Sequence, residues 1–233
     1  MCSELTEALL ATARRLGSAT LHEAAGKIGA LPSAIKPLRQ DWRIAAPVFA
    51  VVGPPQDNLW LHHAIYAAPQ GSVLLHECGG DAEAGYWGGV MANASIVRGL
   101  AGFVTDGGVR DSEELRGLDW PVFSRNICIQ GTGKRNDGAG SLGRSVRIGN
   151  VVAHTGDLLV ADADGVVILP LAQVEQIIHA GVERETKELE IVERLKLGER
   201  TLDMYHLPDT RCARALSAAK APTNQSRDEV VHG

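Results

Sequence analysis

The stretch that decides the fold class is Gly102-Phe103-Val104-Thr105-Asp106-Gly107-Gly108-Val109-Arg110-Asp111. It begins as an apolar run typical of a buried strand and ends in two glycines, an arginine and an aspartate, after which a helix can start. Such a junction is typical of α/β proteins, which bind ligands where strands end and helices begin. Arg110 offers a fork of donors for a carboxylate or phosphate, and Asp111 offers oxygens for a divalent cation.

The composition of the whole chain narrows the class of protein. The 233 residues are 45% hydrophobic, which is enough to build a core. A net charge of -5 argues against a nucleic-acid partner, because phosphate backbones require a basic face. The four cysteines are scattered without a CxxC, as in a reducing compartment. Since neither a signal peptide nor an apolar run of about 20 residues is present, we expect a cytoplasmic protein without a membrane partner.

Apolar periodicity predicts the elements on either side of the opening stretch. Helices are expected at 4–16, 59–68, 89–98, 112–117 and 171–197, and strands at 43–52, 72–76, 100–105, 121–124, 145–153, 157–161 and 166–169. Gly17 should end the first helix, Ser18 or Thr20 should cap a short second one, and Pro47 suggests an edge strand or a bulge. We expect parallel strands early and antiparallel strands late, in one α/β domain over 1–207. A polar C-terminal tail follows at 208–233.

Asp111 allows two interpretations. With Glu114 three residues later it forms a capping-box pattern, which would start the helix at 112–117 and requires no chemistry. Its neighbour Arg110 and the two preceding glycines favour a binding site instead.

The glycine-rich loop at 79–89 also has two interpretations. It is either a flexible turn or, through Gly88-Gly89-Val90-Met91, a helix N-terminus whose amides bind an anion. Nucleotide binding is poorly supported, because neither GxGxxG nor GxxxxGK[ST] spacing is present.

Two groups of histidines and cysteines are candidate metal ligands. Neighbouring residues on a helix diverge by about 100°, so His62 and His63 cannot easily face one metal. Zinc requires three or four convergent ligands, and the segment His76-Glu77-Cys78 does not supply them at the necessary spacing. We expect one of the adjacent pair in the core or an interface, with His62 as a candidate neighbour of the site.

The helix expected at 171–197 places two carboxylates on its apolar stripe. Glu185 and Glu188 lie on that stripe at helical spacing, and carboxylates on a buried face are costly unless they are paired. Either the helix turns outward, or arginines pair with them, or one glutamate completes a charged site, perhaps on a neighbouring subunit.

Several motifs give the chain a family resemblance over about residues 5–207. They are His22-Glu23-Ala24, Asp57-Asn58 with His62, Gly85-Tyr86-Trp87-Gly88, Asp106–Asp111, Gln130-Gly131-Thr132, Gly156–Val167 and Leu202-Asp203-Met204-Tyr205. In these motifs the chain resembles the RraA-like family, and within it the class II 4-hydroxy-4-methyl-2-oxoglutarate / 4-carboxy-4-hydroxy-2-oxoadipate aldolases. The resemblance implies a swivelling β/β/α-type sandwich, assembled as a homotrimer or homohexamer with sites between subunits.

The resemblance also implies an activity. Aldolases of this family use Mg²⁺ or Mn²⁺ to cleave 4-hydroxy-2-oxo acids to pyruvate, and they decarboxylate oxaloacetate. By motif, Arg110 would hold the pyruvyl group and Asp111 the metal. The substrate-binding segment would be Gly88-Gly89-Val90-Met91, with the amides of Val90 and Met91 at the substrate carboxylate. Glu188 would be supplied by the adjacent subunit.

One residue departs from the aldolase pattern. The aldolases carry an aspartate after the glycine of the loop, and this chain has Gly89. The loss of that carboxylate should weaken aldol cleavage more than decarboxylation, which needs no base for a hydroxyl group. The alternative function is that of the RraA regulators, which inhibit a ribonuclease by protein contact and share the fold. The long helix with its inward glutamates favours the enzyme.

Overall fold

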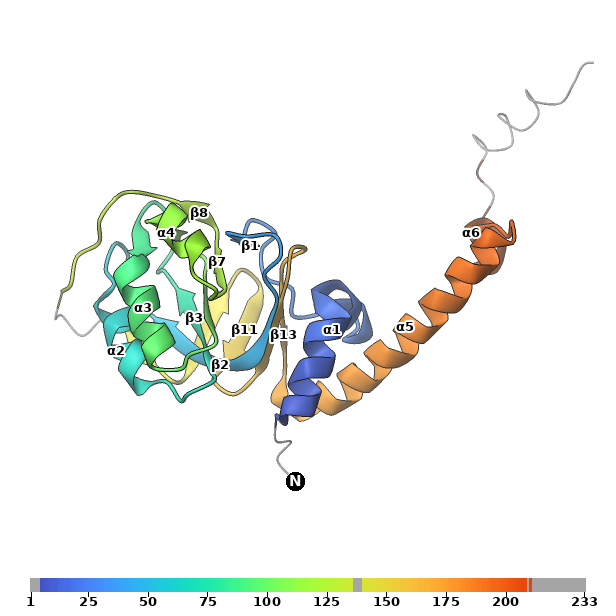
Figure 1. Ribbon diagram of the computed structural model, residues 1–233, viewed down its shortest axis with the longest axis horizontal. Helices are drawn as coiled ribbons and strands as arrows, with labels where there is room; N and C mark the ends of the chain where they lie inside the picture. Colours follow the sequence, from blue (N-terminus) through green and yellow to red (C-terminus); the bar gives the residue numbers. More distant parts are fainter. Residues whose placement is uncertain (1–4, 136–139, 209, 211–233) are drawn as a thin grey trace, which may run out of the picture. The chain divides into compact units, whose positions relative to one another are not determined.

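The computed structural model describes residues 5–135, 140–208 and 210 of the 233-residue chain. Its contacts divide the chain into two units, Met1–Thr186 and Lys187–Gly233, which are described separately. The described strands all belong to the first unit, which is a mixed α/β domain (Figure 1). The expected α/β class and single strand-bearing domain are confirmed. Among the residues described, no helix is long and apolar enough to cross a membrane.

An eight-stranded sheet forms the centre of the first unit. The strand order is β1 (Lys36–Pro37), β7 (Val122–Ser124), β5 (Gly102–Thr105), β3 (Val73–Glu77), β2 (Ile44–Val52), β12 (Leu158–Ala161) and β13 (Val166–Leu169), with β9 (Ser141–Leu142) beside β2. β2, β3, β5 and β7 are parallel, whereas β12 and β13 join antiparallel. The expected change from parallel early strands to antiparallel late strands is therefore confirmed.

Both faces of this sheet are buried, and residues alternate between them along each strand, as the pleat requires. Val51 of β2 and Leu74 of β3 point to the face covered by α2 (Leu59–Ala67), α3 (Gly89–Val97) and α4 (Ser112–Gly117). Ala50 and Leu75 point to the opposite face. There they pack with the hairpin of β10 (Ser145–Ile148) and β11 (Val151–His154).

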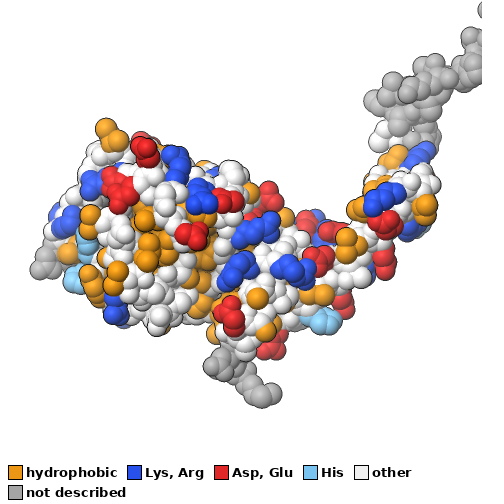
Figure 2. Space-filling view, in the orientation of Figure 1, with side chains coloured by type: hydrophobic (Ala, Val, Ile, Leu, Met, Phe, Trp, Pro, Cys, Tyr) orange, Lys and Arg blue, Asp and Glu red, His pale blue; other side chains and the backbone are white. Residues whose placement is uncertain are grey.

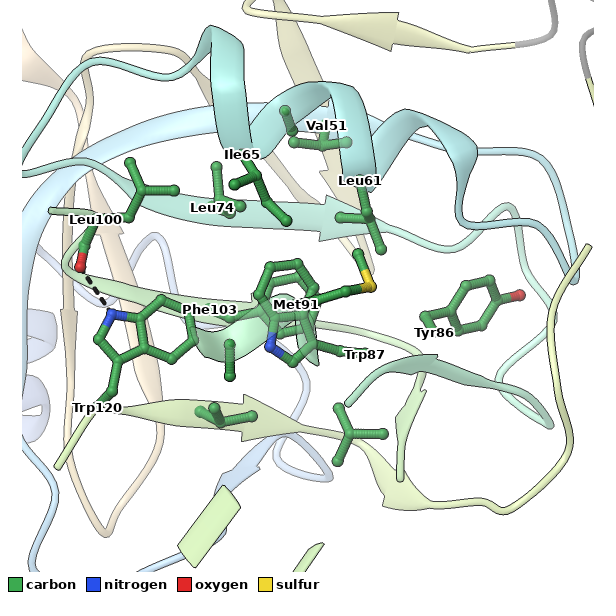
Figure 3. Packing of buried hydrophobic residues seen from close by; sticks show 14 of the residues in the cluster. Val51, Leu61, Ile65, Leu74, Tyr86, Trp87, Met91, Leu100, Phe103 and Trp120 are labelled. Atoms are coloured by element: carbon green, nitrogen blue, oxygen red, sulfur yellow. Dashed lines mark hydrogen bonds between the residues drawn. The ribbon is translucent and has the colours of Figure 1, made fainter. Parts of the chain in front are cut away.

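Aromatic rings fill the core beneath α2 (Figure 3). The rings of Trp87 and Phe103 stack with centroids 4.0 Å apart, and Trp120 continues the stack 5.9 Å from Trp87. The indole N–H of Trp120 donates to the carbonyl of Leu100 at 2.7 Å, so this polar group is satisfied in the core. The stack fixes the strand Gly85–Trp87, which leads directly to Gly88 and the start of α3.

A small parallel sheet completes the region that carries the opening stretch. It contains β4 (Gly85–Trp87), β6 (Gly108–Val109) and β8 (Asn126–Ile127). β4 runs into α3, and β6 runs into Arg110-Asp111 and α4. Because β4 and β6 are parallel neighbours, their carboxyl ends and the two helix starts that follow lie side by side.

The N-terminal helix α1 (Glu7–Ala24) bends where the sequence predicts a break. Gly17 has φ +80°, outside the helical region, and Ser18 begins the second half. The amide and hydroxyl of Ser18 donate to the Asp162 carboxylate at 2.7 and 2.6 Å. Asp162 therefore caps this half from the β12–β13 turn, so this acid of the Gly156–Val167 motif has a structural role. α1 packs on β12, β13 and the start of α5.

Two sequence expectations about strands are wrong. Pro47 lies neither at a sheet edge nor at a bulge. It pairs with Leu158 of β12, pairing with β3 starts at Val48, and neither register shifts there. The proline is accommodated where β2 passes from one neighbour to the other. The run at 145–153 is a hairpin rather than one strand, because Gly149 adopts φ +59° at its turn.

The long helix α5 (Val174–Lys196) follows a 3₁₀ turn at Leu171–Gln173. Asp157 caps that turn, since its carboxylate accepts from the amide of Leu171 at 3.0 Å. The described part of the second unit holds the end of α5 and α6 (Thr201–Met204). The boundary expected at 207 and the tail at 208–233 remain predictions, because most of the tail lies outside the described residues.

Candidate active site

The ends of β4 and β6 bring the glycine loop and the Arg110-Asp111 pair together. Trp87 pairs with Val109, and the amide of Arg110 donates to the carbonyl of Trp87 at 2.8 Å. Gly88 and Arg110 are thus neighbours across the small sheet. The two segments lie 22 residues apart in the sequence, and the parallel pairing of β4 with β6 brings them into contact.

Asp111 occupies an uncommon backbone conformation and binds the neighbouring helix. Its φ is +55° and its ψ +39°, in the left-handed region that few non-glycine residues adopt. Asp111 is the N-cap residue of α4 but makes no side-chain cap hydrogen bond there. Instead, its carboxylate accepts from the amide of Gly89 at 3.1 Å, at the start of α3. The capping-box interpretation is therefore wrong, because it requires the Asp111 side chain to accept from an amide of α4, and that hydrogen bond is not made. Strain of this kind accumulates at functional sites.

Gly88 is required by this arrangement. A Cβ atom added at Gly88 would lie 2.3 Å from Oδ2 of Asp111 and 3.3 Å from Cγ of Arg110. Any side chain at this position would have to displace the carboxylate.

Gly89 is covered by a carboxylate from α4. A Cβ atom at Gly89 would lie 2.1 Å from Oε2 of Glu114 and 2.2 Å from its Cδ. Glu114 Oε1 also accepts from the amide group of Asn93 at 3.3 Å. The space in which an aspartate at 89 would begin thus holds the carboxyl group of Glu114. Sequence spacing identified Glu114 only as a capping partner of Asp111.

A cavity of about 230 Å³ opens beside these residues. It is lined by Asn58, His62, Gly85, Tyr86, Trp87, Gly88, Val90, Met91, Arg110, Asp111 and Lys134. Five of the predicted site residues therefore share one cavity, namely Gly88, Val90, Met91, Arg110 and Asp111. The guanidinium of Arg110 is half exposed, and its Nε lies 3.9 Å from the Asp111 carboxylate.

The wall formed by α2 contributes Asn58 and His62. Asn58 donates to the carbonyl of Tyr86 at 3.1 Å, whereas its buried Oδ1 has no hydrogen-bond partner within the described residues. His63 turns away: it lines a separate cavity, and its ring centroid lies 6.4 Å from that of Trp60. The predicted divergence of the two histidines is confirmed. Burial, and then the charges of Lys134 and His63, lower the pKa of His62 below 6.5.

Lys134 was missed by sequence reasoning, which stopped at the motif Gln130-Gly131-Thr132. Its segment is fixed to the start of α2 by three backbone contacts. The Gly133 amide donates to the carbonyl of Gln56 at 2.7 Å, the Asn58 amide donates to the carbonyl of Gly133 at 3.1 Å, and the Arg135 amide donates to the carboxylate of Asp57 at 2.5 Å. Asp57 is fully buried. The local sequence offered one indication that Lys134 belongs to the site, which is its position as a lysine in a glycine-rich loop.

The segment His76-Glu77-Cys78 is not a metal site. Burial lowers the pKa of His76 to about 3, and its Nδ1 lies 2.9 Å from Oγ1 of Thr105. Burial and the neighbouring Asp106 raise the pKa of Cys78 to about 12. Glu77 accepts from the amide of Arg147 at 2.8 Å. Within the described residues, no three His, Cys, Asp or Glu side chains converge to hold a metal ion.

The structure tests the predicted role of Glu185 in the long helix but not that of Glu188. Glu185 forms an ion pair with Arg15 of α1, so the arginine-pairing interpretation is confirmed for this residue. In Figure 2, basic side chains in the region of α1 lie close to acidic ones. Glu188 belongs to the second unit, so its placement at the active site remains a prediction.

Comparison with known proteins agrees with the fold and the motifs. The model of the RraA-like family, described as Aldolase/RraA, matches residues 5–168. A provisionally named 4-hydroxy-4-methyl-2-oxoglutarate aldolase of Halalkalibacterium halodurans is 30% identical over 175 residues, which cover 75% of this chain and 82% of that protein.

Solved structures give the same result. An uncharacterized protein from Pseudomonas syringae pv. tomato has a TM-score of 0.76 and 25% identity, covering 86% of this chain and 93% of the other. The RNA-processing inhibitor RraA from Thermus has a TM-score of 0.59 and 28% identity, covering 65% and 91%. These matches confirm the RraA-like fold expected from the motifs. The chain belongs to the RraA-like aldolase family.

Proposed function

We propose that the protein is a divalent-metal-dependent carbon–carbon lyase of 2-oxo acids. It cleaves 4-hydroxy-2-oxo acids to pyruvate and a second oxo compound, and it decarboxylates oxaloacetate. The observation that carries the proposal is the single cavity that joins Arg110, Asp111, Lys134 and the first turn of α3. It places cationic groups and one carboxylate around a space suited to a small anionic substrate.

The residues present fit a magnesium ion with few protein ligands. Mg²⁺ keeps several waters and commonly takes one or two carboxylates, so Asp111 alone is a sufficient direct ligand. The Oδ1 of Asn58, which has no hydrogen-bond partner among the residues that the structure describes, is a further acceptor at the cavity wall. Mn²⁺ accepts the same oxygen ligands. When bound, the ion polarises the 2-oxo group and stabilises negative charge that develops on its oxygen.

The protein groups divide the rest of the substrate between them. The first amides of a helix have no partner within the helix, and Asp111 occupies the amide of Gly89. The amides of Val90 and Met91 remain to bind the substrate carboxylate, and Lys134 adds its charge. Arg110 holds the pyruvyl group through its planar donors.

Both reactions pass through the enolate of pyruvate, so one set of donors serves both. A preorganised donor aimed at such an oxyanion lowers the barrier by about 3–4 kcal/mol. Carbon–carbon cleavage also requires removal of the proton on the 4-hydroxyl group, whereas decarboxylation releases CO₂ without that step. We therefore expect oxaloacetate decarboxylation to exceed aldol cleavage in the unmodified protein.

The activity is tested by measuring pyruvate release from oxaloacetate and from 4-hydroxy-4-methyl-2-oxoglutarate. Each assay is run with Mg²⁺, with Mn²⁺ and with a chelator, and the non-enzymatic decay of oxaloacetate is subtracted. We expect turnover that disappears with the chelator and returns with metal. Absence of metal-dependent turnover of both compounds would contradict the proposed lyase.

We also propose a homotrimer or homohexamer in which Glu188 enters the cavity of a neighbouring subunit. A mixture of Asp111→Ala and Glu188→Ala chains, dissociated and reassembled, should then recover activity that neither variant has alone. Light scattering gives the number of subunits. Failure to recover activity in a verified mixed oligomer would remove Glu188 from the site.

A second function is favoured by the likeness to the RNA-processing inhibitor RraA, at 28% identity. A regulator would bind a ribonuclease and inhibit it by contact, with no need for Asp111. Inhibition of ribonuclease activity that survives Asp111→Ala, in the absence of lyase turnover, would favour this function over the lyase.

A further inference from the structure

We propose that His62 is the base that takes the proton from the 4-hydroxyl group during carbon–carbon cleavage and then returns it to the enolate. The inference rests on the proposed lyase function and names one further catalytic residue for it. It stands on the position of His62 in the cavity, and on the contrast with its neighbour His63.

The geometry gives His62 access to a bound substrate. It lies on α2 one turn after Asn58, and both residues line the cavity that contains Arg110, Asp111 and Lys134. Its side chain is half-buried, so it is neither sealed in the core nor fully in solvent. The cavity that holds the substrate-binding amides of Val90 and Met91 therefore also carries an imidazole, a group of the kind a base requires.

The charges in the cavity favour the neutral ring. The ionisable groups that line it with His62 are Tyr86, Arg110, Asp111 and Lys134, and His63 is adjacent on the same helix. Burial is the largest cause that lowers the pKa of His62, followed by the positive charge of Lys134. A histidine that is neutral near pH 7 is ready to accept a proton, whereas a protonated one is not.

The step balances without an outside reactant. A ring nitrogen of His62 takes the proton from the 4-hydroxyl group, and the oxygen electrons form a carbonyl as the bond between C3 and C4 breaks. The electron pair of that bond becomes the enolate of pyruvate. The imidazolium then donates its proton to C3, which yields pyruvate and restores neutral His62.

The experiment compares His62→Gln with the matched control His63→Gln. Loss of a general base typically costs about 10²- to 10⁴-fold, and we expect a loss in this range in kcat for 4-hydroxy-4-methyl-2-oxoglutarate cleavage by His62→Gln. In oxaloacetate decarboxylation no hydroxyl proton passes to His62, so the ring stays neutral and the enolate takes its proton from water. Decarboxylation by the same variant should therefore change little, which also shows that the variant is folded. His63→Gln should keep both activities, because its ring lines the other cavity.

A pH profile gives a second readout. In the unmodified protein, kcat/KM for cleavage should rise with pH as His62 loses its proton, and this acidic limb should be absent from the residual activity of His62→Gln. Equal cleavage by His62→Gln and the parent protein would overturn the inference while leaving the lyase in place. An equal loss of cleavage and decarboxylation would also overturn it. A parent protein without metal-dependent turnover would overturn the proposed function itself.

Discussion

The close approach of Gly88 to the Asp111 carboxylate makes a quantitative prediction for Gly88→Ala. The added Cβ atom would lie 2.3 Å from Oδ2. Non-bonded heavy atoms prefer separations of about 3.5 Å, so the carboxylate must move by roughly 1 Å. A misplacement of about 1 Å in a catalytic arrangement can cost about 100-fold in rate. The expected loss in kcat/KM is therefore about 100-fold, or about 2.7 kcal/mol in transition-state stabilisation.

The backbone allows this substitution, so the loss should be local. Gly88 has φ -154° and ψ -175°, an extended conformation that alanine adopts without strain. Gly89→Ala is the matched control, because its Cβ atom would meet the carboxyl group of Glu114, an exposed and flexible side chain that can turn away.

The assay is metal-dependent pyruvate release from oxaloacetate by the two variants, with thermal unfolding measured beside it. We expect Gly88→Ala to lose activity with its fold intact and Gly89→Ala to stay close to the parent. If Gly88→Ala is as active as Gly89→Ala, the position of the Asp111 carboxylate does not determine the activity and the reasoning is refuted.

Three further predictions follow from other contacts. Gly89→Asp must displace the side chain of Glu114, and it adds a carboxylate at the start of α3. It should raise the rate of aldol cleavage relative to decarboxylation. If the parent protein already cleaves faster than it decarboxylates, the missing carboxylate does not limit cleavage and the prediction is wrong. Asp57→Asn weakens the contact that holds the Lys134 segment, so KM should rise more than kcat falls, and the free energy of unfolding should drop by about 1–3 kcal/mol. Unfolding in urea and steady-state kinetics on one preparation separate the two effects. An unchanged KM would contradict the anchoring role of Asp57. The pKa of His76 is lowered to about 3, so the unfolded state takes up a proton at this residue first as the pH falls. Between pH 6.5 and 3, His76 should therefore make the free energy of unfolding fall by up to about 1.4 kcal/mol per pH unit. Urea titrations of His76→Asn should lack this part of the slope.

Local patterns were sufficient for much of the framework. The helix at 112–117 was predicted with its observed bounds, and the break at Gly17 follows from glycine alone. The strand-to-helix junction at Arg110-Asp111 was recognisable because glycines, an arginine and an aspartate occur together at the end of an apolar run. These features are encoded within a few neighbouring residues.

The missing parts of the site depend on contacts between distant segments. The pairing of β4 with β6 directs the Asp111 carboxylate to α3, whereas spacing alone directed it to its own helix. Glu114 covers Gly89 for the same reason. Lys134 enters the cavity because buried Asp57 holds its segment, and no periodicity links the two residues. Pro47 was misjudged because β2 exchanges neighbours along its length.

The most direct test of the central claim is the metal dependence of pyruvate release in Asp111→Ala and Glu113→Ala. Both residues are exposed acids at the start of α4, but only Asp111 lines the cavity. The proposed site predicts that Glu113→Ala responds to Mg²⁺ like the parent protein, whereas Asp111→Ala shows no turnover of oxaloacetate at any Mg²⁺ concentration above the non-enzymatic rate. Parent-like, Mg²⁺-dependent turnover by Asp111→Ala would contradict the assignment of this carboxylate to the metal.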